Sequence, residues 1–294
     1  MRRVLLAAAA SLMFVAPALA QVPMGLLTPT PPPPAPPTIP PPGPGDWRPI
    51  DAENTLVIDT NKGRILVELY PLAAPATVDQ IKTLVRKHFY DGQTFFRVID
   101  GFMDQTGDPK NDGSGGSTLP NLKAEFTFRH TPGAGETDVT PIPAGEVGFV
   151  GTMPVVSQPS AMAAMTVDGK VSSFGLFCSG VIGLARAEAD DSGNSQFFLM
   201  RADHFDLDQK YTAFGRVVFG ESVVRAIKVG EPVEAPQDKM VTVQVLADLP
   251  AAGRPNPRVV DTSSAYFKTE IDTLHAAQHD DFNPCAVDIP TQGG

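Results

Sequence analysis

The sequence predicts a mainly antiparallel β protein, closed or sandwiched, in one enlarged domain. Many short segments alternate apolar and polar side chains or are rich in β-branched and aromatic residues, and few stretches show helical spacing. The chain has 294 residues, of which 42% are hydrophobic and 19% charged, so it can bury a core. Because neither end resembles a packed core, this length favours one large domain over two.

The first elements are a hairpin and a helix. Residues 55–60 and 65–69 have strand-like alternation on either side of the turn Asn61-Lys62-Gly63, which predicts a β-hairpin. Residues 77–85 follow, and their apolar side chains lie on one helical face: Val78, Ile81, Leu84 and Val85. This spacing predicts a helix.

The rest of the domain is read as strands and turns. Residues 94–107 predict a short strand broken at Gly101. Residues 112–117 are rich in Gly and Ser, but Leu119-Pro120 follows where a phosphate-binding loop needs Gly-Lys-Ser/Thr, so they predict a plain loop. Further strands are expected at 147–150, 180–185, 196–200 and 211–218, with a polar turn at 190–194.

The charge of the chain argues against two classes of partner. There are 23 Lys and Arg against 33 Asp and Glu, a formal net charge of -10. A protein that binds nucleic acid through its phosphates needs a basic surface, and no basic cluster is present in the sequence. Neither nucleic acid nor anionic lipid is therefore an expected partner.

The first twenty residues have the layout of a cleaved signal peptide. Arg2 and Arg3 precede an apolar run from Val4 to Val15, and the segment ends Pro17-Ala18-Leu19-Ala20 with small residues at the cleavage positions. An uncleaved membrane helix is the alternative, but the run is shorter than the ~20 residues that a bilayer requires. We expect a periplasmic protein, with secretion as a second possibility and no stable membrane insertion after cleavage.

Residues 21–50 predict a linker. Most residues between Pro29 and Pro44 are proline, which favours an extended polyproline II rod. A stiff spacer is the preferred interpretation, and a ligand for a proline-binding domain is the alternative. Beyond it we expect a domain over residues 51–250 and a C-terminal extension over residues 251–294.

The sequence allows more than one role for its two cysteines and for a pair of histidines. Cys178 and Cys285 form a disulfide in an oxidising compartment, or Cys178 stays a buried thiol in an apolar stretch. In the extension, residues 263–279 predict a helix in which His275 and His279 have metal-binding spacing. A solvated helix end explains them as well and no distal ligand is evident, so we predict no metal and no other cofactor.

Three segments together resemble the cyclophilins, the peptidyl-prolyl cis-trans isomerase family. They are residues 78–98, with Phe89-Tyr90-Asp91-Gly92-Gln93-Thr94-Phe95-Phe96-Arg97-Val98, residues 101–109, with Gly101-Phe102-Met103-Asp104-Gln105-Thr106-Gly107, and residues 183–218, with Asn194-Ser195-Gln196-Phe197-Phe198 and Leu207-Asp208-Gln209-Lys210-Tyr211-Thr212-Ala213-Phe214-Gly215. The resemblance covers roughly residues 55–229 and is interrupted by a long insertion at about 130–174. It implies a closed eight-stranded antiparallel barrel capped by two helices.

The resemblance also implies the site. Arg97 matches the family's catalytic arginine, and Gln105 matches the group that orients the substrate backbone. The positions that match the substrate pocket are Phe102, Met103, Ala185, Arg186, Phe198, Leu207 and Tyr211. An arginine suits the reaction because its donors stay charged and are aimed as a fork.

Several positions depart from the family's pattern. Tyr211 stands where many members have histidine, Arg186 replaces the usual asparagine, and Asp206 occupies a position that is often tryptophan. Phe205 supplies the missing ring only if its loop shifts by one residue, so binding of cyclic-peptide inhibitors is in doubt. The insertion fits either a flexible flap over the groove or a passive surface excursion.

These observations lead to one preferred function and two alternatives. The preferred one is a cofactor-independent isomerase that accelerates X-Pro rotation in exported, unfolded or folding proteins. The first alternative is a catalytically weak peptide-binding or chaperone module. The second is an envelope spacer, which explains the proline-rich rod but not the pocket residues.

Overall fold

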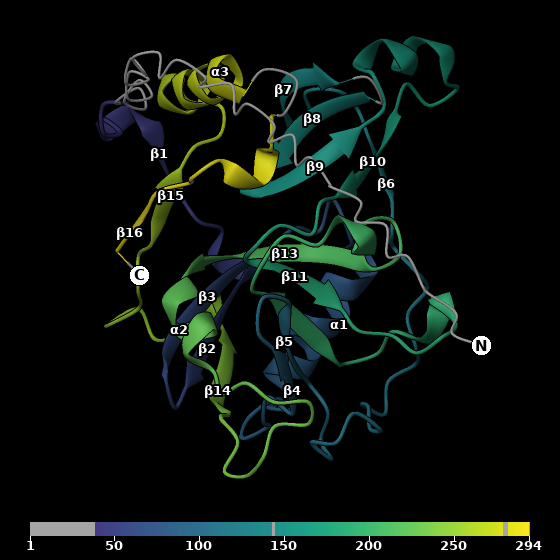
Figure 1. Ribbon diagram of the computed structural model, residues 1–294, viewed down its shortest axis with the longest axis vertical. Helices are drawn as coiled ribbons and strands as arrows, with labels where there is room; N and C mark the ends of the chain where they lie inside the picture. The colour runs from purple at the N-terminus through teal and green to yellow at the C-terminus, as the bar shows by residue number, and fades with distance from the viewer. Residues whose placement is uncertain (1–38, 143–144, 279–281, 294) are drawn as a thin grey trace, which may run out of the picture. The chain divides into compact units, whose positions relative to one another are not determined.

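The computed structural model describes residues 39–142, 145–278 and 282–293. The predicted signal peptide and residues 21–38 of the predicted linker lie outside the described residues. No described helix is both long enough and apolar enough to cross a bilayer. The described chain contains three antiparallel sheets, shown in Figure 1.

The largest sheet has eight strands in the order β14-β2-β3-β13-β11-β12-β5-β4. Its strands are β2 (Thr55–Thr60), β3 (Gly63–Leu69), β4 (Arg97–Ile99), β5 (Met103–Thr106), β11 (Val181–Leu184), β12 (Phe197–Met200), β13 (Thr212–Phe219) and β14 (Met240–Val245). The sheet curls, and isolated bridges such as Thr94 to Lys239 link its two edges in place of a full ladder. The predicted eight-stranded cyclophilin-like fold is confirmed, but the predicted closed barrel is a curled sheet whose edges are not joined by a ladder.

Two helices accompany this sheet, as predicted. Helix α1 (Pro75–Arg86) buries the predicted stripe, including Val78 and Ile81, in the core between the strands. Pro75 opens it, where a missing N–H costs nothing. Helix α2 (Glu221–Ala226) is short and buries Val224.

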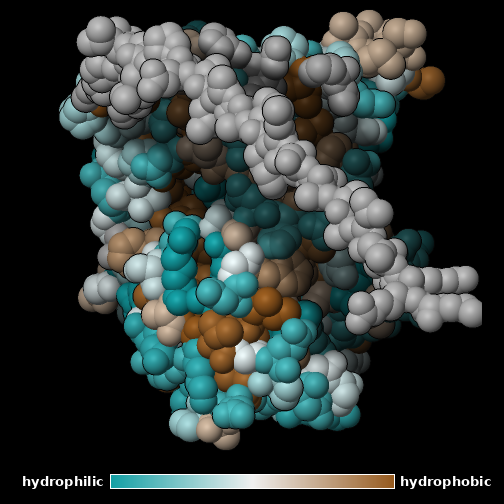
Figure 2. Space-filling model, viewed as in Figure 1, coloured by the Kyte–Doolittle hydropathy of each residue, from teal (hydrophilic) through white to brown (hydrophobic). Residues whose placement is uncertain are grey.

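The insertion is a second, five-stranded antiparallel sheet and not a flexible flap. Its order is β6-β10-β9-β8-β7, with β6 (Phe128–His130), β7 (Thr137–Ile142), β8 (Gly145–Val150), β9 (Met153–Ser157) and β10 (Val171–Gly175). The 3-10 helix η3 (Ser160–Met165) joins β9 to β10. Met165 and Val167 are exposed at this tip, where Figure 2 shows apolar surface.

A buried polar cluster fastens the strands of this second sheet. His130 Nε2 contacts both Glu136 and the Ser173 hydroxyl, the latter at 2.7 Å. The Ser157 hydroxyl donates to Glu136 Oε1 at 2.5 Å. Burial lowers the pKa of His130, but the hydrogen bond and charge of Glu136 outweigh it and hold that pKa above its usual value. The cluster is closed to solvent and is therefore structural.

The third sheet joins the two ends of the described chain. Strand β1 (Trp47–Pro49) pairs with β15 (Arg258–Val260), which pairs with β16 (Thr291–Gln292). Trp47, near the end of the segment 21–50 that the sequence predicts as a linker, packs with the C-terminal extension. Arg48 also donates to the buried carboxylate of Glu68 at 2.7 and 2.8 Å.

The C-terminal extension packs on the insertion. Helix α3 (Ala265–Gln278) corresponds to the helix predicted for residues 263–279, and Phe267 meets Phe149 of β8 edge to face at 5.1 Å. His275 lies near the Thr140 hydroxyl at 3.4 Å. His279 lies outside the described residues.

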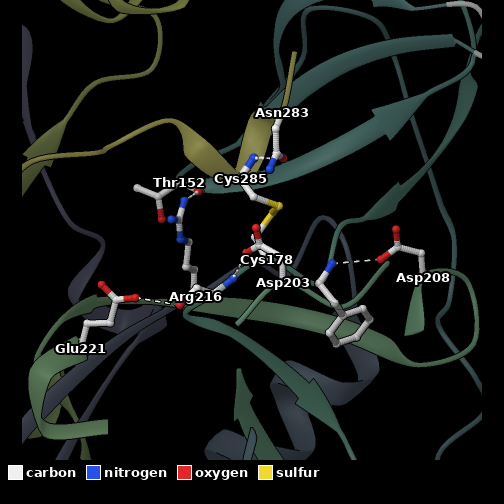
Figure 3. Close-up of a disulfide and its surroundings, with 10 residues drawn as sticks. Thr152, Cys178, Asp203, Asp208, Arg216, Glu221, Asn283 and Cys285 are labelled. Carbon is white, nitrogen blue, oxygen red and sulfur yellow. Dashed lines mark hydrogen bonds between the residues drawn. A yellow bond between two sulfur atoms is a disulfide. The ribbon is translucent and has the colours of Figure 1, made fainter. Parts of the chain in front are cut away.

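A disulfide ties this extension to the large sheet. Cys178, just before β11, is bonded to Cys285 in η8 (Pro284–Ala286), and the two residues are 107 apart in sequence. Figure 3 shows the bond, with the N–H of Cys285 donating to Asn283 Oδ1 at 3.0 Å. Of the two alternatives for Cys178, the structure has the bridge.

We expect the disulfide to contribute strongly to stability. A bond that closes so long a loop restricts the unfolded chain, so the double substitution Cys178→Ala and Cys285→Ala should lower the free energy of unfolding by about 2–4 kcal/mol. Urea unfolding with and without reductant measures this effect. The double variant, which has no bond to break, is the control. A wild-type midpoint that reductant leaves unchanged would contradict the prediction.

Candidate active site

Strand register brings the predicted catalytic and pocket residues into one row. Arg97 of β4 stands opposite Gln105 of β5, and Gln105 stands opposite Phe198 of β12. Phe198 in turn stands opposite Gly183 of β11. Because directly paired residues share one face of a sheet, the side chains of Arg97, Gln105 and Phe198 lie next to one another.

Gly183 is required in this row by the space available. A Cβ atom at this position would lie 2.4 Å from the Phe198 ring and 2.7 Å from the Phe177 ring. The two rings are stacked with their centroids 5.8 Å apart. The absence of a side chain at Gly183 therefore lets Phe198 lie flat and form the wall of a cavity.

One cavity of about 120 Å³ gathers every residue that the sequence assigned to the site. It is lined by Arg97, Phe102, Met103, Gln105, Ala185, Arg186, Phe198, Leu207 and Tyr211. Met103, Phe198 and Leu207 are buried, whereas the Arg97 side chain is 37% exposed. The cavity thus has an apolar floor that includes Met103, Phe198 and Leu207, and polar groups of Arg97, Gln105 and Arg186 border it.

A larger, polar cavity of about 380 Å³ shares residues with the first. Gln105, Ala185 and Arg186 belong to both. Among the described residues, none of the insertion from 130 to 174 lines either cavity. Of the two alternatives for the insertion, a flap over the groove and a surface excursion, the described residues favour the second.

A chain of amides holds the polar side of the site. Arg97 Nη1 donates to Gln105 Oε1 at 3.3 Å, and Gln105 Nε2 donates to Gln196 Oε1 at 3.0 Å. Gln196 Nε2 then donates to the carbonyls of Gly113 and Gly115, at 3.0 and 2.7 Å. The Gly/Ser loop thereby fixes the orientation of Gln105. Gln196 lies in the matched segment Asn194-Ser195-Gln196-Phe197-Phe198, but no role in the site was predicted for it.

Arg97 has a second partner that sequence reasoning missed. Its Nε donates to Glu231 Oε1 at 2.6 Å. Glu231 is 134 residues away in sequence and carries no motif, so no pattern in the chain indicates it.

The opposite wall is formed by Tyr211 and Arg186. The Tyr211 ring meets Phe198 edge to face at 5.7 Å, and the Arg186 guanidinium lies 4.8 Å from the centre of the Tyr211 ring. Arg186 also donates to the carbonyls of Lys210, Ala187 and Glu188. Its side chain therefore braces the wall and supports the loop that follows β11.

Phe205 does not replace the ring that is missing at Asp206. Its side chain is half exposed, and it does not line the apolar cavity. The side chain of the neighbouring Asp206 faces His204, with Oδ1 3.3 Å from His204 Nδ1. The wall next to Leu207 consequently lacks the large ring that the resemblance leads one to expect.

No metal site is evident in the described part of the chain. The one group of Cys, His, Asp and Glu atoms close enough to share an ion is Cys178, Cys285 and Asp203. Both thiols of that group are used in the disulfide (Figure 3).

Comparison with known proteins identifies the family of this chain. The family model for the cyclophilin type peptidyl-prolyl cis-trans isomerase matches residues 55–246, about two thirds of the chain. This chain belongs to the cyclophilins. It is therefore a peptidyl-prolyl cis-trans isomerase, an enzyme that acts on proline-containing peptides.

Individual relatives extend the likeness. A probable peptidyl-prolyl cis-trans isomerase of Brucella suis is 33% identical over 213 residues, covering 67% of this chain and 85% of its own. Peptidyl-prolyl cis-trans isomerase-like 1 of Gibberella zeae is 30% identical over 199 residues, covering 66% and 95%. The crystal structure of cyclophilin AquaCyp293 from Hirschia baltica has a TM-score of 0.75 and 32% identity, and covers 85% of this chain and 94% of that one. Its coverage exceeds that of the family model, so the likeness reaches beyond the cyclophilin domain.

A buried carboxyl lies directly behind the cavity. Asp104, between Met103 and Gln105 on β5, is fully buried, and neither of its oxygens has a hydrogen-bond partner among the described residues. The nearest cation is Arg201, with Nη1 3.5 Å from Oδ1. Burial raises the pKa of Asp104 to about 7, although the charge of Arg201 opposes the rise.

This carboxyl should make stability depend on pH. Its folded pKa of about 7 lies above the unfolded value of ~3.9, so the folded state binds a proton that the unfolded chain releases. The stabilisation is complete below the unfolded value and is lost as the pH rises through about 7. Asp104→Asn should remove this pH-dependent contribution. The free energy of unfolding of the variant, measured in urea from about pH 5 to about pH 8, should therefore rise relative to that of the wild type. A difference in the free energy of unfolding between the two proteins that does not change with pH would contradict this prediction.

Proposed function

We propose that this isomerase assists the folding of exported proteins and that Arg97 and the apolar cavity beside it carry the reaction. The observation that supports the proposal is the convergence of all nine predicted side chains on one cavity that is open at Arg97. The N-terminal sequence pattern supports the exported location.

The reaction requires no nucleophile. An X-Pro bond isomerises over tens to hundreds of seconds unaided, because rotation must break amide resonance across a barrier of about 18–20 kcal/mol. A donor that binds the prolyl nitrogen or the twisting carbonyl more strongly as conjugation is lost stabilises the transition state selectively. The free N–H groups of Arg97 at the cavity rim are placed for this task.

The cavity and its surroundings hold the rest of the substrate. A proline ring is apolar and fits walls made of Phe102, Met103, Phe198 and Leu207. Gln105, oriented by Gln196, offers an amide to the substrate backbone. Residues next to the proline extend toward the larger polar cavity, which the shared residues Ala185 and Arg186 connect to the first. Tyr211 keeps an aromatic wall, so histidine is not required there.

Removal of the proposed catalytic donor tests this assignment. Arg97→Ala should lower kcat/KM on a short X-Pro peptide by about 10²-fold or more, the usual effect of deleting one transition-state donor. Arg97→Lys keeps the charge but lacks the forked arrangement of donors, so its kcat/KM should lie between those of the wild type and Arg97→Ala. Protease-coupled or NMR-exchange assays measure the rates. Arg129→Ala is the matched control, because Arg129 lies on the insertion and pairs with Asp168. Full activity in folded Arg97→Ala would contradict the assignment of Arg97 as the catalytic donor.

Export and client class are tested separately. The full chain expressed in a Gram-negative host should be recovered from the periplasm with Gln21 as its first residue, as measured by fractionation and mass spectrometry of the intact protein. The mature protein should also accelerate the proline-limited refolding phase of a secreted protein, and Arg97→Ala should not. A cytosolic product that begins at Met1 would contradict the exported role while leaving the isomerase activity untouched.

A further inference from the structure

Backbone pairing places Glu231 directly opposite Arg97. Val98 and Gly230 exchange two backbone hydrogen bonds, each 2.8 Å long, which form an isolated antiparallel bridge. In an antiparallel pair the residue before one partner faces the residue after the other, so Arg97 faces Glu231. The bond from Val233 N–H to the Phe96 carbonyl, at 2.9 Å, continues the contact.

The loop that carries Glu231 has little freedom to move away. A Cβ atom at Gly230 would lie 2.7 Å from the Val233 Cα atom, so the tight path of the backbone requires glycine there. The N–H of Lys228 donates to Asp238 Oδ2 at 2.8 Å, and the Lys228 Nζ donates to the Glu234 carbonyl at 2.7 Å. The backbone of this loop therefore holds Glu231 opposite Arg97, from where its carboxylate reaches Nε.

We propose that Glu231 is a positioning residue that holds the guanidinium of Arg97 in its catalytic orientation. Two contacts define the plane of that group: Nε to Glu231 at 2.6 Å and Nη1 to Gln105 at 3.3 Å. The Gln105 contact is long, and the Arg97 side chain is 37% exposed, so the carboxylate is the stronger restraint. The inference rests on the catalytic role of Arg97 proposed above.

The geometry favours positioning over inhibition. Glu231 does not line the apolar cavity, and it uses Nε, the guanidinium donor nearest the backbone. The described residues make no hydrogen bond to Nη2, and Nη1 has a second N–H besides the one given to Gln105. Both terminal groups thus keep a donor for the substrate while Nε is held.

Two substitutions on this loop test the inference. Glu231→Gln removes the charge with little change in size and should lower kcat by about two- to fivefold with KM nearly unchanged, in keeping with the modest strength of an exposed ion pair. Glu234→Gln is the matched control, because it makes the same charge change three residues away on the same exposed loop. In contrast to Glu231, the Glu234 side chain makes no ion pair among the described residues. Its activity should equal that of the wild type.

Two further measurements separate positioning from a general effect on folding. Raising salt to about 1 M, where the screening length is about 3 Å, should bring the wild-type rate toward that of Glu231→Gln and leave the variant unchanged. The NMR resonance of the Arg97 Nε–H group should shift in Glu231→Gln and stay in place in Glu234→Gln. In an Arg97→Ala background, Glu231→Gln should have no further effect on the residual rate.

The outcomes are distinct. If Arg97→Ala abolishes activity but Glu231→Gln matches Glu234→Gln, the positioning role is wrong and the catalytic assignment stands. A faster Glu231→Gln enzyme would also overturn the inference, because the carboxylate would then be a competitor of the substrate. If Arg97→Ala is fully active, the catalytic assignment itself fails, and the inference fails with it.

Discussion

The register of β5 between β4 and β12 is the constraint on which the site depends. Gln105 faces Arg97 on one side and Phe198 on the other only in this register. A slip of one residue would turn Gln105 inward and bring the carboxyl of Asp104 to the cavity, since successive side chains alternate between the faces of a strand. The backbone ladder therefore decides which side chains meet before any contact between them forms.

The wall formed by Phe198 is supported from behind by the second sheet. Phe198 and Phe177 share one apolar cluster with Val150 and Met153 of the insertion. The C-terminal extension covers the insertion through Phe267, and the disulfide fastens that extension near Phe177. The additions to the domain thus brace the cavity without bordering it, so they affect its shape through packing and not by covering its entrance.

Local patterns in the sequence predicted the hairpin and α1, and the family resemblance predicted the cavity residues. Of the second sheet, the sequence predicted only the strand at 147–150, which is part of β8. Strand β9 was missed because it is buried on both faces, so the alternation that signals a strand is absent. Strand β1 was missed because it has only three residues and follows a proline-rich segment, so it shows no alternation of apolar and polar side chains. Glu231 and Gln196 act through contacts far apart in sequence, and no local pattern records such contacts.

Three arginines surround the site, and the number of donors already taken separates their roles. Arg201 is buried between Asp104 and the carbonyl of Arg225, where it balances charge inside the protein. Arg186 gives its donors to backbone carbonyls and its flat face to Tyr211, which makes it part of the wall. Arg97 lies at the cavity rim, and its Nη2 has neither a hydrogen bond nor an ion pair among the described residues, whereas Nη2 of Arg186 pairs with Asp190 at 3.5 Å. The same side chain is structural or reactive according to what its neighbours leave free, and for Arg97 those neighbours are one amide and one carboxylate.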